Sequence, residues 1–274
     1  MSSAIERSAT RRHVTAASLA AGSAAFVGVP AQAQQGRRTF VLVHGAWHGG
    51  WCWRRVADIL QAQGHKVFTP TMSGLADRSH LAEAGLRIGL DTHVTDIANV
   101  FRWEGVTDAV LCGHSYGGMV ISGVIERLAR QTDAIRSAVF LDAFLPADGQ
   151  SLFDLATPPV REMIGNLQRQ NAAAVPPIPA RVFRVNERDQ AWVDALCTPQ
   201  AISTYTDAVR LTGALGGVPK KTYVRAVGYP SASFDDARAR LSGDPAWRVL
   251  DMPCGHDAMI DMPAQLAEIL VDAA

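Results

Sequence analysis

The stretch that decides the fold is LCGHSYGGMV, residues 111–120. An apolar run, DAVLC (108–112), leads into GHSYG (113–117), and a helix-type spacing of apolar residues follows at once. A Gly-x-Ser-x-Gly turn between a strand and a helix is typical of a nucleophilic serine, because the turn is too tight for flanking side chains and places the serine at a helix N-terminus. A glycine-rich turn with a passenger serine is disfavoured by the strand before it and the helix after it. We therefore predict that Ser115 is a nucleophile.

Short apolar runs alternate with helix-type patterns on both sides of this motif. Six runs have the length and β-branched content of strands: 39–44, 66–70, 108–113, 137–144, 222–227 and 246–252. Helix patterns occupy the intervals 51–64, 91–105, 118–131, 234–242 and 263–273. Strands that alternate with helices form a parallel sheet covered by helices on both faces. The sequence therefore predicts an α/β fold with a mostly parallel sheet of about six strands.

The interval 146–220 interrupts this alternation. It contains the proline clusters TPPV (157–160) and VPPIPA (175–180) and two helix patterns, but no strand pattern. Insertions of this length in compact domains usually carry function. We expect a helical cap over the strand ends, with residues 38–145 and 221–274 forming the core.

A glycine-rich loop, HGAWHGG (44–50), follows the first predicted strand. Acyl transfer by a serine needs N–H donors for the oxyanion that develops during the reaction. One donor normally belongs to the residue after the nucleophile, here Tyr116, and the other to the loop after an early strand. We assign the second donor to Ala46. No metal site is expected, because His44 and His48 would need a helix and a third ligand to converge on an ion.

Three stretches carry a family resemblance: VLVHGAWHGGWCW (41–53), GHSYGGM (113–119) and GHDAM (255–259). In this order they resemble the α/β-hydrolase superfamily. More narrowly, they resemble its compact branch of plant methyl-salicylate esterases, hydroxynitrile lyases and bacterial carboxylesterases. The resemblance covers nearly everything after residue 38 and implies the α/β-hydrolase fold.

The base of a catalytic triad is expected after the last strand. His256 lies in the loop between the last predicted strand and the last predicted helix, from where it can reach back over the sheet to Ser115. The other histidines are less suitable by position. His65, for example, precedes a strand, and His114 lies inside the turn and points away from the serine hydroxyl.

The triad acid departs from the usual pattern of the family. In most relatives it follows the strand before the last, but here that place reads AVGYPSASFDD (226–236), with no carboxylate near its start. Asp142 follows the preceding strand in an apolar setting, where a carboxylate is costly to bury without a partner such as His256. Asp235 and Asp236 come later and suit the first turn of a helix. We prefer Asp142 over the Asp235/Asp236 pair.

An intact Ser-His-Asp set predicts a serine hydrolase that acts through an acyl-enzyme, without a cofactor. The apolar pocket candidates named below favour small to medium, lipophilic or aromatic carboxylic esters as substrates. A ligand-binding or receptor-like protein with little turnover stays open as an alternative. Hydroxynitrile-lyase chemistry is disfavoured, because those relatives carry a lysine after the catalytic histidine and a threonine in the first loop, where this chain has Asp257 and Gly45. Five apolar side chains are candidates for the substrate pocket: Trp47, Phe144, Phe153, Met163 and Trp192.

The first 33 residues have the composition of a secretory signal of the twin-arginine type. Arg11 and Arg12 precede an uncharged stretch rich in Ala, Gly and Ser, and 31–33 form a small-x-small cleavage pattern. An uncleaved membrane anchor is the alternative, although the stretch is short and weakly apolar. We expect an exported protein, periplasmic or secreted, with no membrane attachment after cleavage.

Charge and cysteine content set further bounds. The 26 basic and 26 acidic residues give a net charge of zero, which gives no reason to expect a nucleic-acid partner. The expected partner is a small-molecule ester, and the oligomeric state stays open. The four cysteines form no metal-type C-x-x-C pair, and export would permit a disulfide whose pairing stays open.

Overall fold

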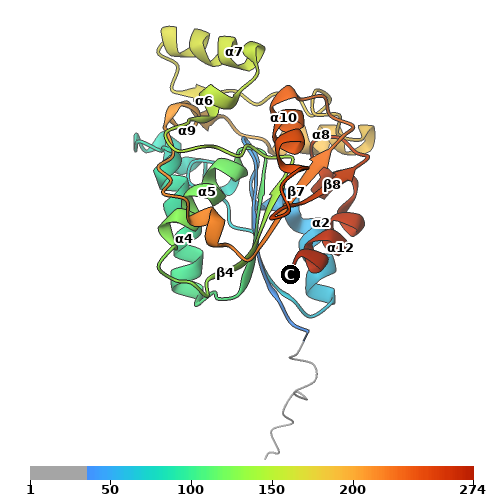
Figure 1. Ribbon diagram of the computed structural model, residues 1–274. Helices are drawn as coiled ribbons and strands as arrows, with labels where there is room; N and C mark the ends of the chain where they lie inside the picture. The colour runs from blue at the N-terminus through green and yellow to red at the C-terminus, as the bar shows by residue number, and fades with distance from the viewer. Residues whose placement is uncertain (1–35) are drawn as a thin grey trace, which may run out of the picture. The chain divides into compact units, whose positions relative to one another are not determined.

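The computed structural model describes residues 36–274 (Figure 1). The predicted signal segment, 1–33, lies outside the described residues. Within the described part of the chain, no helix is both long enough and apolar enough to cross a bilayer.

Six parallel strands form the central sheet, in the order β2-β1-β3-β4-β7-β8. The strands are β1 (Thr39–Val43), β2 (Lys66–Phe68), β3 (Ala109–His114), β4 (Ile135–Leu141), β7 (Lys220–Ala226) and β8 (Arg248–Met252). Every residue of the central strand β3 is buried, as expected where helices cover both faces of a parallel sheet. The predicted fold class is confirmed.

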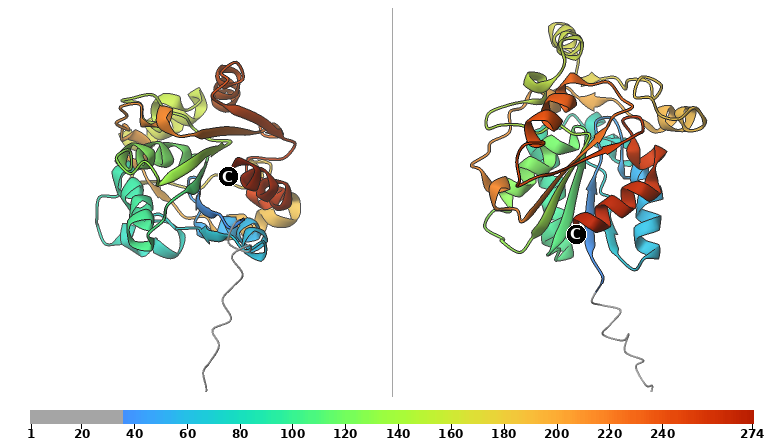
Figure 2. Two further views of the ribbon diagram at one scale, coloured as in Figure 1. Left: turned by 60° about the horizontal axis from the view of Figure 1, so that its bottom comes forward. Right: turned by 45° about the vertical axis from the view of Figure 1, so that its right-hand side comes forward.

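Helices cover both faces of this sheet (Figures 1 and 2). On one face α2 (Arg54–Ala62) packs against α12 (Pro263–Ala273), and on the other α4 (Leu90–Glu104) packs against α5 (Gly117–Arg127). Helix α10 (Ala232–Leu241) packs against β7. Shorter elements complete the core: η1 (Gly50–Trp53), η2 (Ala76–Arg78), α3 (His80–Glu83) and α11 (Ala258–Asp261).

The strand order reverses between β1 and β3, which are neighbours in the sheet although β2 separates them in the chain. In open α/β sheets the loops at such a reversal diverge and leave a crevice at the carboxyl ends of the strands. The loop after β1 (44–50) and the turn after β3 (113–117) therefore border the same crevice.

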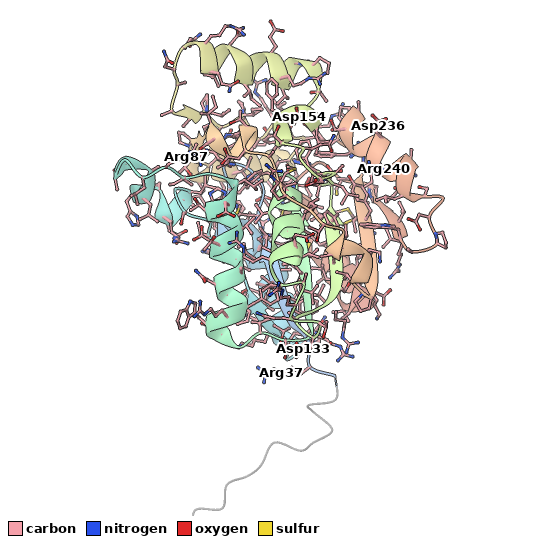
Figure 3. All side chains as sticks on the ribbon, turned by 60° about the vertical axis from the view of Figure 1, so that its left-hand side comes forward. Arg37, Arg87, Asp133, Asp154, Asp236 and Arg240 are labelled. Carbon is pink, nitrogen blue, oxygen red and sulfur yellow. The ribbon has the colours of Figure 1, made fainter. Side chains whose placement is uncertain are left out.

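The segment between β4 and β7 is mainly helical. It holds α6 (Leu152–Leu155), α7 (Pro158–Arg169), α8 (Glu187–Leu196), α9 (Ser203–Thr206) and η3 (Ala214–Gly217). The expectation of a segment without strands was wrong, because β5 (Ala174–Val175) and β6 (Gln200–Ala201) form an antiparallel pair. Two-residue strands are too short to leave an alternating pattern in the sequence. Asp154 of α6 and Asp236 of α10 line a cleft of about 420 Å³ between this segment and the core (Figure 3).

Candidate active site

Ser115 occupies a strained turn between β3 and α5. Its φ of 54° lies in the left-handed region, which costs a residue with a Cβ on the order of 1–3 kcal/mol. The flanking glycines are required for space: a Cβ on Gly113 would lie 2.5 Å from the carbonyl oxygen of Gly117, and a Cβ on Gly117 would lie 2.8 Å from that of Val43. This is the geometry that presents a serine hydroxyl at the carboxyl edge of the sheet.

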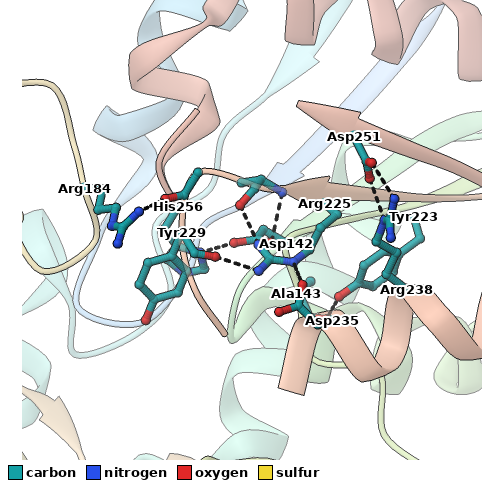
Figure 4. Close-up of polar contacts among 12 residues, drawn as sticks. Asp142, Ala143, Arg184, Tyr223, Arg225, Tyr229, Asp235, Arg238, Asp251 and His256 are labelled. Atoms are coloured by element: carbon teal, nitrogen blue, oxygen red, sulfur yellow. Dashed lines mark hydrogen bonds and ion pairs between the residues drawn. The ribbon is translucent and has the colours of Figure 1, made fainter. Parts of the chain in front are cut away.

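His256 and Asp142 form a buried pair (Figure 4). The Nδ1 atom of His256 lies 2.6 Å from Oδ2 of Asp142, and Asp142 is 0% exposed. Asp142 directly follows β4 with a φ of 41°, and its N–H donates to the carbonyl of Val224 on the neighbouring strand. With Nδ1–H donating to the carboxylate, Nε2 is left to take a proton. Ser115 and His256 line the same cavity, so the structure brings the predicted nucleophile, base and acid to one site.

The alternative acids lie elsewhere. Asp235 accepts a hydrogen bond of 2.8 Å from Nε of Arg225, and its side chain is 59% exposed. Asp236 lines the separate cleft beside α6. Within residues 36–274, neither carboxylate forms a hydrogen bond or ion pair with His256.

The predicted oxyanion donors lie on backbone next to Ser115. A Cβ on Gly45 would come within 3.0 Å of the Cβ of Ser115, so the loop that carries Ala46 runs directly against the serine. In the described part of the chain, the N–H groups of Ala46 and Tyr116 donate to no protein group. Two free donors beside a serine hydroxyl are what a tetrahedral oxyanion requires.

His44 shapes this loop through both nitrogens of its ring. Burial lowers the pKa of His44 to about 3, so the ring is neutral. Its Nδ1–H donates to the carbonyl of Gly45 and its Nε2 accepts from the N–H of Met72. Both ring nitrogens are therefore committed to holding the loop backbone.

His93 supports the other side of the turn, a role that the sequence analysis missed. Its Nε2–H donates to the carbonyl of Ser73 at 2.9 Å, and its Nδ1 accepts from the hydroxyl of Tyr116 at 2.9 Å. Burial lowers the pKa of His93 to about 4, which keeps the ring neutral and able to accept. The ring thus anchors the side chain of Tyr116, the residue predicted to supply one oxyanion donor.

A second buried acid–imidazole pair lies beside the Asp142–His256 pair. The Nδ1–H of His48 donates to the carbonyl of Ala46 at 2.7 Å, and its Nε2 lies 3.3 Å from Oδ2 of Asp257. Burial lowers the pKa of His48, but the charges of Asp257 and Cys197 and their hydrogen bonds to the ring together raise that pKa well above its ordinary value. The ring nitrogen Nε2 of His114 donates to the carbonyl of His256 at 3.0 Å. This network ties the loop that carries Ala46 to the loop that carries His256.

The cavity above Ser115 has a volume of about 120 Å³ and is mainly apolar. Two predicted pocket residues, Trp47 and Phe144, line it. Its other apolar and aromatic lining residues are Leu152, Ala156, Val160, Ile178, Tyr205, Tyr229, Pro230 and Phe234. Hydroxyls of Thr157, Ser231 and Ser233 are its further polar groups, and none of the carboxylates, lysines or arginines among residues 36–274 lines it. Such a lining suits a neutral, lipophilic or aromatic ligand.

The other three predicted pocket residues do not line this cavity. Trp192 packs edge-on against Trp51 with ring centroids 5.0 Å apart, and Phe153 and Met163 pack against the hydrophobic core. Their neighbours Leu152 and Val160 face the cavity instead. The sequence could place these residues in the cap, but it could not give the rotation of each cap helix about its axis.

Titratable side chains in the described residues form no metal-type cluster of three or more His, Cys, Asp or Glu. The four cysteines, all of which are described, are free. The site therefore combines a serine in a strained turn, a buried His–Asp pair and two free backbone N–H donors around an apolar cavity.

Comparison with known proteins places this site in a family. Residues 40–269 match the profile of the Alpha/beta hydrolase family. The chain belongs to this family. A carbendazim hydrolyzing esterase from Nocardioides sp. (strain SG-4G) is 43% identical over 240 residues, which cover 84% of this chain and 97% of that protein. The esterase PIR7B from Oryza sativa subsp. japonica is 25% identical over 87% of this chain and 96% of its own length.

Solved structures agree on the fold. An extracellular alpha/beta-hydrolase from a Paenibacillus species superposes with a TM-score of 0.73 at 23% identity, covering 86% of this chain and 99% of the other. Together with the full-length similarity to esterases, this makes the protein an ester hydrolase of the α/β-hydrolase family.

Proposed function

We propose that the protein is a serine esterase that acts through an acyl-enzyme formed on Ser115. The hydroxyl of Ser115 attacks the ester carbonyl while His256 takes its proton, and the N–H groups of Ala46 and Tyr116 stabilise the oxyanion. His256 then gives the proton to the departing alcohol. In the second half, His256 takes a proton from water, which attacks the acyl-enzyme, and Ser115 leaves with that proton as the acid is released. The observation that carries this proposal is the 2.6 Å contact between His256 and Asp142 at the cavity that holds Ser115.

The cavity supports a lipophilic or aromatic ester of small to medium size as the substrate. Its lining offers aromatic faces and hydroxyls, and within the described part of the chain it includes no lysine or arginine that would pair with a phosphate or carboxylate of the substrate. We therefore expect neutral esters to be preferred over charged ones. The similarity to the Nocardioides esterase makes carbendazim a further compound to test on this protein.

We also propose that residues 1–33 direct export. The paired arginines, the uncharged Ala- and Gly-rich stretch and the small-x-small pattern support this proposal. Fractionation of cells that express the full chain would test it, with retention of the uncleaved chain in the cytoplasm as the contrary result.

Hydrolysis of p-nitrophenyl esters from acetate to decanoate tests the esterase proposal. The protein and its Ser115→Ala variant are compared at equal concentration, and the variant is expected to lose at least about 10³-fold in kcat/KM. The chain-length optimum would measure the size of the cavity. Hydrolysis that persists in the variant would exclude Ser115 as the nucleophile, and no turnover by the unmodified protein would favour a binding protein with little activity.

A further inference from the structure

Arg225, the penultimate residue of β7, is a buried cation in contact with the proposed triad acid. Its side chain is 1% exposed. One guanidinium nitrogen, Nη1, donates to Oδ1 of Asp142 at 2.8 Å, and Nε donates to Asp235 at 2.8 Å (Figure 4). The same guanidinium also donates to the carbonyls of Ala226 and Tyr229. Burial lowers the pKa of Arg225, but the charge of Asp142 and the hydrogen bond that Arg225 donates to Asp235 raise it above its ordinary value, so the group stays cationic.

These contacts fix both oxygens of Asp142. Oδ1 accepts from Arg225 and from the N–H of Ala226 at 3.1 Å, and Oδ2 accepts from His256. A fully buried carboxylate without a permanent cation would be costly to keep ionised. The planar fork of an arginine also sets the orientation of the carboxylate, which a point charge does less well.

We propose that Arg225 is a positioning residue of the esterase reaction, which holds Asp142 ionised and oriented toward His256 and limits how strongly the acid stabilises the imidazolium. The inference rests on the proposed function of Ser115 and His256. With Arg225, the charges of the guanidinium and Asp142 cancel in the resting site. They still cancel in the tetrahedral intermediate, where the imidazolium and the oxyanion add one positive and one negative charge. The buried site therefore carries no net charge at either stage.

Among the groups near His256 and Asp142, Arg225 has the largest electrostatic effect on them. The titratable or charged groups around His256 and Asp142 are His114 from β3, Tyr223 and Arg225 from β7, Tyr229, Cys254 and Asp257 from loops, Asp235 from α10 and Arg184 from the cap. Burial lowers the pKa of His114 and raises the pKa values of both tyrosines, so these rings stay neutral. Burial raises the pKa of Cys254 to about 12, so the thiol is neutral as well.

Three charged groups remain besides Arg225 in this surrounding: Asp257, Asp235 and Arg184. Asp257 is offset by its ion pair with His48, and Asp235 is more than half exposed. Arg184 donates to the carbonyl of Gly228 from the exposed side of the cap. Arg225 is therefore the one of these charges that is both buried and in direct contact with Asp142.

The acid limb of the pH profile of kcat/KM measures the effect of Arg225 on His256, because His256 must be neutral to act as base. The guanidinium of Arg225 and the imidazolium of His256 lie on opposite sides of one carboxylate, on the order of 7 Å apart. At an effective dielectric constant of about 20, their repulsion shifts the acid limb by roughly one to two pH units. Replacement of Arg225 by an uncharged residue removes this repulsion, so Asp142 stabilises the imidazolium of His256 more strongly. The acid limb is therefore expected to move to higher pH.

The experiment compares four variants with the unmodified protein by kcat/KM for p-nitrophenyl acetate between pH 5 and 9. Arg225→Met is expected to move the acid limb upward by about one to two pH units and to lose at least about tenfold in kcat/KM at pH 7. Arg225→Lys keeps the charge, so its acid limb should lie within a few tenths of a pH unit of that of the unmodified protein. Part of the loss in kcat should remain, because lysine lacks the planar fork that orients the carboxylate. Asp235→Asn leaves Arg225 less compensated and should move the limb downward by a few tenths of a unit.

Arg238→Met is the matched control, because Arg238 forms a comparable two-point pair with Asp251 at the surface (Figure 4). Its pH profile should match that of the unmodified protein. If Arg225→Met does not fold, the lysine and Asp235→Asn variants decide by themselves. Acid limbs that coincide in all variants would overturn the inference and leave Arg225 a purely structural role. Activity of a Ser115→Ala variant would instead overturn the proposed function.

Discussion

Replacement of Asp142 by asparagine separates the orientation of the base from the packing around it. The Oδ1 position receives donors from Arg225 and from the N–H of Ala226, so the asparagine carbonyl oxygen will take that place. The amide NH₂ must then face Nδ1 of His256, where the carboxylate now accepts. The ring has to accept at Nδ1 and carry its proton on Nε2, which leaves no acceptor for the hydroxyl of Ser115.

The lost charge sets the magnitude. A carboxylate and an imidazolium about 4 Å apart interact by about 4 kcal/mol at an effective dielectric constant of about 20. At about 1.4 kcal/mol per factor of ten, kcat/KM of Asp142→Asn is expected to fall by about 10³-fold.

Steady-state hydrolysis of p-nitrophenyl acetate at pH 7 to 8 measures this loss, with circular dichroism as the check that the variant is folded. Asp235→Asn is the matched control and should retain kcat/KM within about threefold, because its carboxylate contacts Arg225 and not the base. A loss below tenfold in folded Asp142→Asn, or a larger loss in Asp235→Asn, would refute Asp142 as the acid.

Two further predictions concern the buried histidines. Burial lowers the pKa values of His44 and His93 to about 3 and about 4, whereas unfolded histidines titrate near 6.5. The unfolded chain therefore binds more protons below pH 6.5, and each ring should lower the free energy of unfolding by roughly 1.4 kcal/mol per pH unit as the pH falls from 6.5 to 5. Urea denaturation measures this, and a stability that stays constant over that range would contradict it. Asp257→Asn leaves His48 without its ion-pair partner and loosens the backbone of Ala46. In steady-state assays kcat should therefore fall by about tenfold with little change in KM. An unchanged kcat would show that the His48–Asp257 pair does not support the oxyanion loop.

Local patterns explain why the sequence predicted the sheet and the nucleophile. The six strands leave apolar runs, and the Ser115 turn needs small residues at fixed offsets, so both can be read from neighbours in the chain. Asp142 could be inferred because β4 and β7 lie side by side and an apolar setting demands a partner for a carboxylate. These features depend on short-range rules and on one long-range pairing.

The missed features depend on contacts between distant segments. Arg225 lies in an ordinary strand pattern, TYVRAV, and nothing in that pattern shows that Asp142 and Asp235 enclose it. His48 and Asp257 are 209 residues apart, and only the folded chain places them together. The pocket walls depend on the rotation of short cap helices, which left Phe153 out of the cavity.

Covalent trapping tests the nucleophile most directly. The protein is incubated with a fluorophosphonate, and intact mass spectrometry and peptide mapping locate the adduct. One adduct per chain is expected, on the peptide that contains Ser115, together with full loss of esterase activity and no labelling of Ser115→Ala. An adduct on another residue, or esterase activity that survives complete labelling of Ser115, would contradict the proposed acyl-enzyme.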